Sequence, residues 1–222
     1  MLLERDPAVY QQLLQLKLVP TIFSFLDLEH PNNTVHLLRL IGGIVSATAA
    51  QAGGAELDEL YSLGLLERLM SILSYAVENN VADFFDATLG TMHAALRVGG
   101  ARNAGLLRAL PSMLALLGSR DLGVCEGAVG AIKALVEQFP SETAAPVLAD
   151  GSIWRALSSW KDEILLIELL EVVGAAALDA TAAVAPEMLE VVAALCEMEG
   201  SEEVNSSANG VLVGLKMRAL NA

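Results

Sequence analysis

Three histidines and two cysteines are the side chains of this sequence best suited to nucleophilic, acid–base or metal chemistry. None of His30, His36 and His93 has a cysteine or a second histidine at metal-ligand spacing. Cys125 and Cys196 each stand in an apolar helical pattern, which is typical of buried thiols in a reducing compartment. We therefore expect no catalytic residue, no metal site and no cofactor.

Acidic side chains form the next candidate group. Asp162, Glu163, Glu168 and Glu171 follow one predicted helix, and Asp86 occupies a similar place on an earlier one. Paired carboxylates can do general acid–base work, but nothing in the flanking sequence indicates a pocket. Gly-x-Ser-x-Gly, Walker, Rossmann and HExxH patterns do not occur either. We interpret these carboxylates as a solvated or partner-binding face, and we expect no enzyme.

Composition narrows the class of partner. The 222 residues include 27 acidic and 13 basic side chains, a formal net charge of −14. Such a surface repels nucleic-acid phosphates and anionic lipid, and it either favours a basic protein partner or serves only solubility. No apolar run reaches the length of a membrane span, and the N-terminus lacks the pattern of a signal peptide. We expect a cytoplasmic protein that binds neither nucleic acid nor membrane.

The elements that position these side chains are helices. Hydrophobic residues make up 54% of the chain but aromatic residues only 5%, a composition that suits Ala- and Leu-rich helices better than strands. Within 121–139, Val124, Ala128, Ile132 and Leu135 fall on one apolar stripe. A short helix, a second helix, a polar turn and a longer third helix recur along the whole chain.

Two sets of landmarks give the period of this recurrence. The last large apolar residues of the second helices are 47, 44, 43 and 35 residues apart: Leu26, Leu73, Leu117, Trp160 and Leu195. Glycines midway along the third helices are 48, 40, 44 and 36 apart: Gly42, Gly90, Gly130, Gly174 and Gly210. Three of the four spacings in the first set match the roughly 40–47-residue unit of HEAT and armadillo repeats, and the last is short. The second set varies along the chain in step with the first. We expect repeats at about 1–52, 53–98, 99–139, 140–179 and 180–222, forming a single domain that is a fragment of a larger protein.

Several helix boundaries follow from capping residues. Asn33 or Thr34 is the expected N-cap of the third helix of the first repeat, Ser141 caps a short helix through Ala149, and Asp162 caps the helix over 163–178. A short helix is also expected over 102–108. Trp154 and Trp160 are six positions apart on one second helix, so they face different ways. We expect one in the core and Trp160 as an interface anchor; the alternative is that both are packed between repeats.

The units resemble armadillo repeats. Gly64 to Leu73 reads like the family's second helix, and 130–135 (Gly-Ala-Ile-Lys-Ala-Leu) resembles its Gly-Ala-Leu-x-Asn-Leu motif. The resemblance covers essentially the whole chain and implies an all-α, right-handed α-solenoid of about five repeats that binds partners on a concave face lined by third helices. Peptide-carrying members place an asparagine in that motif, whereas this chain has Ala94, Ala134 and Gly214. The resemblance therefore favours a helix or folded surface over an extended basic peptide.

We accordingly predict a non-enzymatic scaffold or adaptor that binds a protein partner, basic or helical, on the third-helix surface. The residues expected to contact the partner are His93, Lys133, Glu168, Glu171, Asp86 and Trp160. An assembly chaperone and an Hsp70 nucleotide-exchange factor of the armadillo type are alternatives of the same class. An enzyme on a helical repeat and a structural oligomer that pairs through its truncated end repeats are alternatives of other classes.

Overall fold

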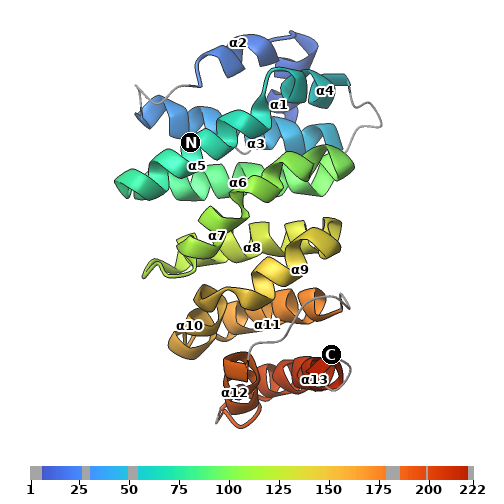
Figure 1. Cartoon of the computed structure of the whole chain (residues 1–222). Coiled ribbons are helices and arrows are strands. Elements are labelled where there is room, and N and C mark those ends of the chain that lie inside the picture. Colours follow the sequence, from blue (N-terminus) through green and yellow to red (C-terminus); the bar gives the residue numbers. More distant parts are fainter. Residues whose placement is uncertain (1–6, 27–30, 50–54, 179–185, 199, 220–222) are drawn as a thin grey trace. The chain divides into compact units, whose positions relative to one another are not determined.

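The computed structural model describes residues 7–26, 31–49, 55–178, 186–198 and 200–219. Within these ranges the chain forms helices and turns without a strand (Figure 1), which confirms the all-α prediction. Among the described helices, none is long and apolar enough to cross a membrane. His30 and the expected repeat boundaries near residues 52 and 180 lie outside the described residues.

The chain divides into two compact units, Met1–Ala109 and Leu110–Ala222. The helices of the first unit are α1 (Pro7–Gln15), α2 (Val19–Ser24), α3 (Pro31–Ala49), α4 (Ala55–Ser62), α5 (Leu65–Asn79), α6 (Ala82–Gly99) and the 3-10 helix η2 (Gly100–Ala109). The long third helices α3 and α6 pack side by side, and this is the most extensive helix pair of the unit. Helices α1, α2 and α4 contact α3, and α5 and η2 contact α6.

The second unit repeats the plan. Its helices are α7 (Leu110–Leu116), α8 (Leu122–Gln138), α9 (Pro140–Ala149), α10 (Gly151–Ser159), α11 (Glu163–Ala177), α12 (Pro186–Leu195) and α13 (Glu202–Ala219). The third helices α8, α11 and α13 follow one another, with α11 packed on both of the others (Figure 1). The predicted armadillo-like arrangement of stacked third helices is therefore present within each unit.

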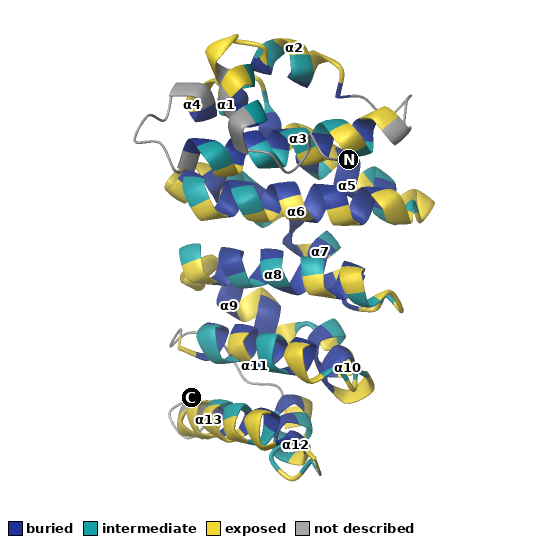
Figure 2. Ribbon diagram, turned by 180° about the vertical axis from the view of Figure 1, so that it is seen from behind, coloured by how far each residue is buried: buried dark blue, intermediate teal, exposed yellow. Residues whose placement is uncertain are grey.

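The apolar stripe of each third helix forms the core. Buried and exposed positions recur around α6 with helical periodicity (Figure 2), and Phe84, Leu89 and Met92 are fully buried. In α8, the predicted stripe that ends at Leu135 is buried throughout, and Leu135 itself has no exposed surface. Burying such side chains supplies the main stabilisation of helices that are too short to form alone.

Acidic N-caps fix the starts of three helices in the second unit. The Asp162 carboxylate accepts the Leu165 N–H at 2.9 Å, which confirms the predicted cap of α11. Asp121 caps α8 in the same way, and Asp150 caps α10. Each carboxylate satisfies a backbone donor that the first helical turn leaves without a partner.

Other predicted boundaries were wrong. Helix α3 begins at Pro31, because proline is tolerated in the first turn, so Asn33 and Thr34 lie inside the helix. Helix α9 likewise begins at Pro140, and Ser141 does not cap it. The helix expected over 102–108 is part of the 3-10 helix η2, which begins at Gly100, a glycine with a positive φ of 54°.

Candidate protein-binding surface

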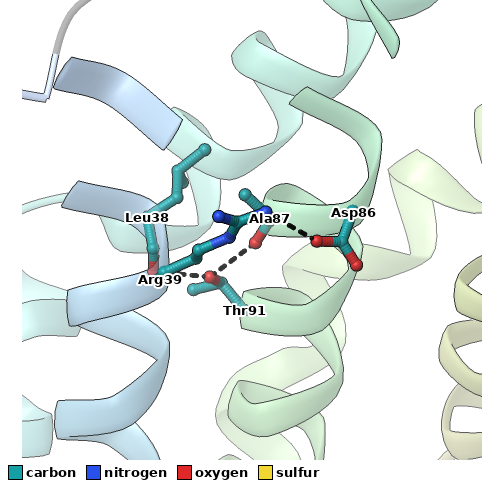
Figure 3. A network of polar contacts seen from close by, with 5 residues as sticks. All are labelled: Leu38, Arg39, Asp86, Ala87 and Thr91. Atoms are coloured by element: carbon teal, nitrogen blue, oxygen red, sulfur yellow. Dashed lines mark hydrogen bonds and ion pairs between the residues drawn. The ribbon is translucent and has the colours of Figure 1, made fainter. Parts of the chain in front are cut away.

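The exposed side of α3 and α6 forms the third-helix surface of the first unit. Arg39 of α3 donates to Asp86 of α6 at 3.1 Å, and both side chains are largely exposed (Figure 3). Beneath this pair, the buried Thr91 hydroxyl lies 2.8 Å from the carbonyl oxygens of both Leu38 and Ala87. The ion pair and the hydroxyl together join the two helices.

A glycine lets these helices approach closely. A Cβ atom on Gly42 would lie 3.0 Å from the Thr91 hydroxyl oxygen and 3.4 Å from the Thr91 Cα, tighter than an ordinary contact. Beside this crossing is a hollow of about 300 Å³ whose lining includes Gly42, Gly90, Ala94 and the Arg39–Asp86 pair. The landmark glycines of the sequence therefore mark a depression on this surface.

The exposed side of α8, α11 and α13 forms the third-helix surface of the second unit. Lys133 of α8 donates to Glu171 of α11 at 2.5 Å. The hydrogen bond to Glu171 is the main reason why the pKa of Lys133 is raised above its usual value. This pair links neighbouring third helices as Arg39 and Asp86 do in the first unit.

Glu168 completes an acidic cluster around Lys133. Burial raises the pKa of the Glu168 carboxyl, the positive charge of Lys133 opposes this shift, and the negative charges of Glu126, Glu171 and Asp162 add to it. One lysine is thus surrounded by several carboxylates. The cluster carries a net negative charge even with the Lys133–Glu171 pair formed.

An apolar groove of about 460 Å³ runs between α11 and α13 next to this cluster. Its walls are small and aliphatic residues of both helices, with Glu171 at the edge: Leu170, Glu171, Gly174, Ala175, Ala177, Leu178, Ser207, Gly210, Val211 and Gly214. The absence of a side chain at Gly210 and Gly214 leaves the groove open, since no atom lies within 4 Å of a Cβ built on either residue. Glu171 therefore belongs both to the acidic cluster and to the edge of an apolar groove.

The structure brings together three of the six residues predicted to contact a partner. Lys133, Glu168 and Glu171 share the third-helix surface of the second unit. His93 and Asp86 both lie on α6 and are exposed, and they belong to the first unit.

Trp160 is the sixth predicted residue, and it lies elsewhere in the second unit. It follows the last residue of α10 and lines a different cavity, described below. Sequence reasoning missed Arg39 as the partner of Asp86, and it missed the α11–α13 groove. The signal for the first was available, because Arg39 and Asp86 are opposite charges 47 residues, one repeat, apart.

Peptide-binding armadillo repeats carry asparagines at three positions where this chain has no side-chain amide. Ala134 is buried, Ala94 lines the hollow of the first unit, and Gly214 lines the α11–α13 groove. An extended peptide would therefore find no side-chain amide at these three positions to hold its backbone.

The described part of the chain shows no arrangement of side chains suited to metal binding or to thiol chemistry. No group of three or more His, Cys, Asp and Glu side chains in those ranges is placed to hold a metal ion. Cys125 and Cys196 are free thiols, and burial raises the pKa of each, which disfavours the nucleophilic thiolate.

The fold of this chain matches solved structures of designed and engineered proteins. A designed armadillo repeat protein for modular peptide recognition matches with a TM-score of 0.71 and 16% identity over 96% of this chain and 88% of that chain. A designed armadillo repeat protein in complex with the peptide (KR)4 matches with a TM-score of 0.71 and 17% identity over the same shares. An engineered protein matches with a TM-score of 0.75 and 15% identity over 97% of this chain and 86% of its own.

No protein-family model matches the sequence, and no curated protein sequence matches it. At these identities the structural matches establish the fold, which is an armadillo-like repeat fold, as the repeat spacing predicted.

Proposed function

We propose that this chain, with its armadillo-like fold, is a protein-binding scaffold whose second unit holds a basic amphipathic helix of a partner. The segment lies on the third-helix surface, with apolar side chains in the α11–α13 groove and basic side chains at Glu168 and Glu171. The single observation that carries the proposal is the position of Glu171, which stands in the acidic cluster and at the edge of the groove.

The groove favours a helix as the bound element. Its lining is apolar and made of small side chains, so it accepts apolar anchors at helical spacing, as in other helix-in-groove complexes. The missing amides at Ala94, Ala134 and Gly214 argue against an extended peptide held by its backbone. The (KR)4 complex of a designed armadillo protein supports basic side chains as ligands for this fold. Binding, rather than catalysis, is the function that these features support.

Charge reversal tests the acidic half of the proposal. A labelled amphipathic peptide of lysine and leucine should bind the chain, and Glu168→Lys with Glu171→Lys should weaken it by about tenfold or more. Binding to the unaltered chain should also weaken as salt is added. The reversal should change unfolding free energy by less than about 1 kcal/mol, because partly exposed charges contribute little to folding.

Filling the groove tests the apolar half. Gly210→Phe should block the peptide without unfolding the protein, since the space above Gly210 is empty. Gly90→Phe is the matched control, because Gly90 is an equally open third-helix glycine in the first unit. Loss of binding with Gly90→Phe alone would place the partner on the first unit. If both glutamate reversals leave affinity unchanged while Trp160→Ala abolishes it, the partner docks on the second-helix side and the proposal is wrong.

A further inference from the structure

A cavity of about 1010 Å³ lies between two second helices of the second unit, α7 and α10. One wall is the end of α7 and the turn after it, and the other is α10 with Trp160. The lining residues are Ala115, Leu117, Gly118, Ser119, Arg120, Ser152, Trp154, Arg155, Ala156, Ser158, Ser159 and Trp160. Its volume is at the upper end of ligand clefts, roughly 300–1,000 Å³, and the third-helix surface contributes none of these residues.

The charge of this cavity is opposite to that of the chain. Arg120 and Arg155 line it, and none of the lining residues is Asp or Glu, although the chain carries 27 acidic and 13 basic residues. Within the described residues, neither arginine forms an ion pair. Arg155 donates only to neutral acceptors, the Gly151 carbonyl at 3.2 Å and the Ser152 hydroxyl at 3.3 Å.

Two carboxylates stand close in sequence to these arginines, but both are engaged elsewhere. Asp121 accepts the Val124 N–H at 3.3 Å and caps α8. Asp150 accepts the Ser152 N–H at 2.7 Å and caps α10. Among the described residues, no carboxylate is paired with the guanidinium group of Arg120 or Arg155.

The walls of the cavity are aromatic and apolar. Trp154 is 7% exposed and Trp160 is half-buried, with Leu117 and Ala156 buried in the same lining. Indole faces suit an apolar or aromatic side chain, and tryptophan and arginine are the residues most enriched among interface anchors.

We propose that this cavity is a second docking site, which takes a short acidic segment of a protein partner. Carboxylates of the segment pair with Arg120 and Arg155, and an aromatic side chain between them packs against Trp154 and Trp160. The forked guanidinium donates two parallel hydrogen bonds to a carboxylate, which gives the site its selectivity for acidic side chains. The segment must be short, since the remaining surface of a chain with net charge −14 repels an extended acidic partner.

The two tryptophans provide a direct measurement, because they are the only ones in the chain and both line the cavity. We would titrate the full chain with the peptide DEDFDED and follow tryptophan emission. The neutral peptide SGSFSGS and the basic peptide KRKFKRK are the matched comparisons. The acidic peptide should shift the emission and bind at least about tenfold tighter than either comparison.

Variants tie the signal to the arginines. Arg120→Gln with Arg155→Gln should weaken the acidic peptide by about tenfold or more, because both charge-assisted contacts are lost. Arg68→Gln, an exposed arginine of α5 in the first unit, should leave its affinity unchanged. Circular dichroism of each variant confirms that the helices persist.

Three results would overturn the proposal. The first is equal binding of the three peptides, and the second is an unchanged affinity in the double arginine variant. The third is a full emission shift with inorganic phosphate alone, which would make the cavity a site for free anions. None of these outcomes depends on whether a basic helix binds the third-helix surface.

Discussion

Alanine at Gly43 should destabilise the first unit, whereas alanine at Gly90 should stabilise it. Both glycines lie inside third helices, Gly43 in α3 and Gly90 in α6. A Cβ on Gly43 would stand 2.2 Å from Cζ of Tyr10 and 2.5 Å from its Cε1 and Oη. Tyr10 is only 7% exposed, so its ring cannot simply swing into solvent. A Cβ on Gly90 meets no atom within 4 Å.

The size of the effect follows from two terms. Glycine in a helix interior costs about 1 kcal/mol relative to alanine, so Gly90→Ala should gain about that much. Overpacking a filled site costs about 1–3 kcal/mol of stability. In Gly43→Ala this cost opposes the stabilisation that alanine brings to the helix. Because the helix term is common to both variants, the difference between them isolates the clash with Tyr10. We expect that difference to be about 1–3 kcal/mol, with Gly43→Ala the less stable.

Urea unfolding followed by far-ultraviolet circular dichroism measures this difference. The two sites belong to one compact unit, so the same transition reports both. Tyr10→Leu removes the ring atoms that a Cβ at Gly43 would meet, and in that background Gly43→Ala should become stabilising, like Gly90→Ala. If Gly43→Ala stabilises the unaltered chain as much as Gly90→Ala does, α1 does not pack on α3 as described.

Three further expectations concern stability. Leu135→Ala should cost about 2–5 kcal/mol in urea unfolding because Leu135 is fully buried, and a loss under roughly 0.5 kcal/mol would contradict the packing of α8. Asp162→Ala should cost about 0.5–2 kcal/mol by removing the N-cap of α11, while Asp162→Asn should retain most of it. Burial raises the pKa of Tyr61 from 10.0 to about 12, with Arg102 opposing. The contribution of Tyr61 is therefore full below pH 10 and is lost as pH rises to about 12. Urea midpoints over that range should fall more in the unaltered chain than in Tyr61→Phe.

Periodicity and capping chemistry made the fold predictable. The apolar stripe through Leu135 and the cap at Asp162 depend on local sequence alone, and both predictions were confirmed. The prediction failed at Asn33, Thr34 and Ser141, because a nearby proline already provides a suitable first turn. The short helix expected over 102–108 is present within η2, but the sequence pattern did not specify that it is a 3-10 helix.

The candidate surface could be predicted only in part. Lys133 and Glu171 are 38 residues apart, about one repeat, so repeat spacing alone placed them near each other. The α11–α13 groove exists because Gly174, Gly210 and Gly214 in its lining carry no side chains. The sequence records these glycines, but it does not show that the space above Gly210 and Gly214 stays open, whereas a Cβ on Gly174 would lie 3.3 Å from Val211. The cavity at Trp160 needed the spatial approach of α7 and α10, which no local signal encodes.

Among the described helices of the second unit, α13 packs mainly against α11 and α12. In a stack of this kind, each helix layer depends on its immediate neighbour for burial, so α13 can open while α8 and α11 stay folded. Amide protons of α13 should then exchange with deuterium sooner than those of α8. A ligand bound between α11 and α13 binds only the form in which α13 is folded. Ligand binding should therefore slow amide exchange along α13.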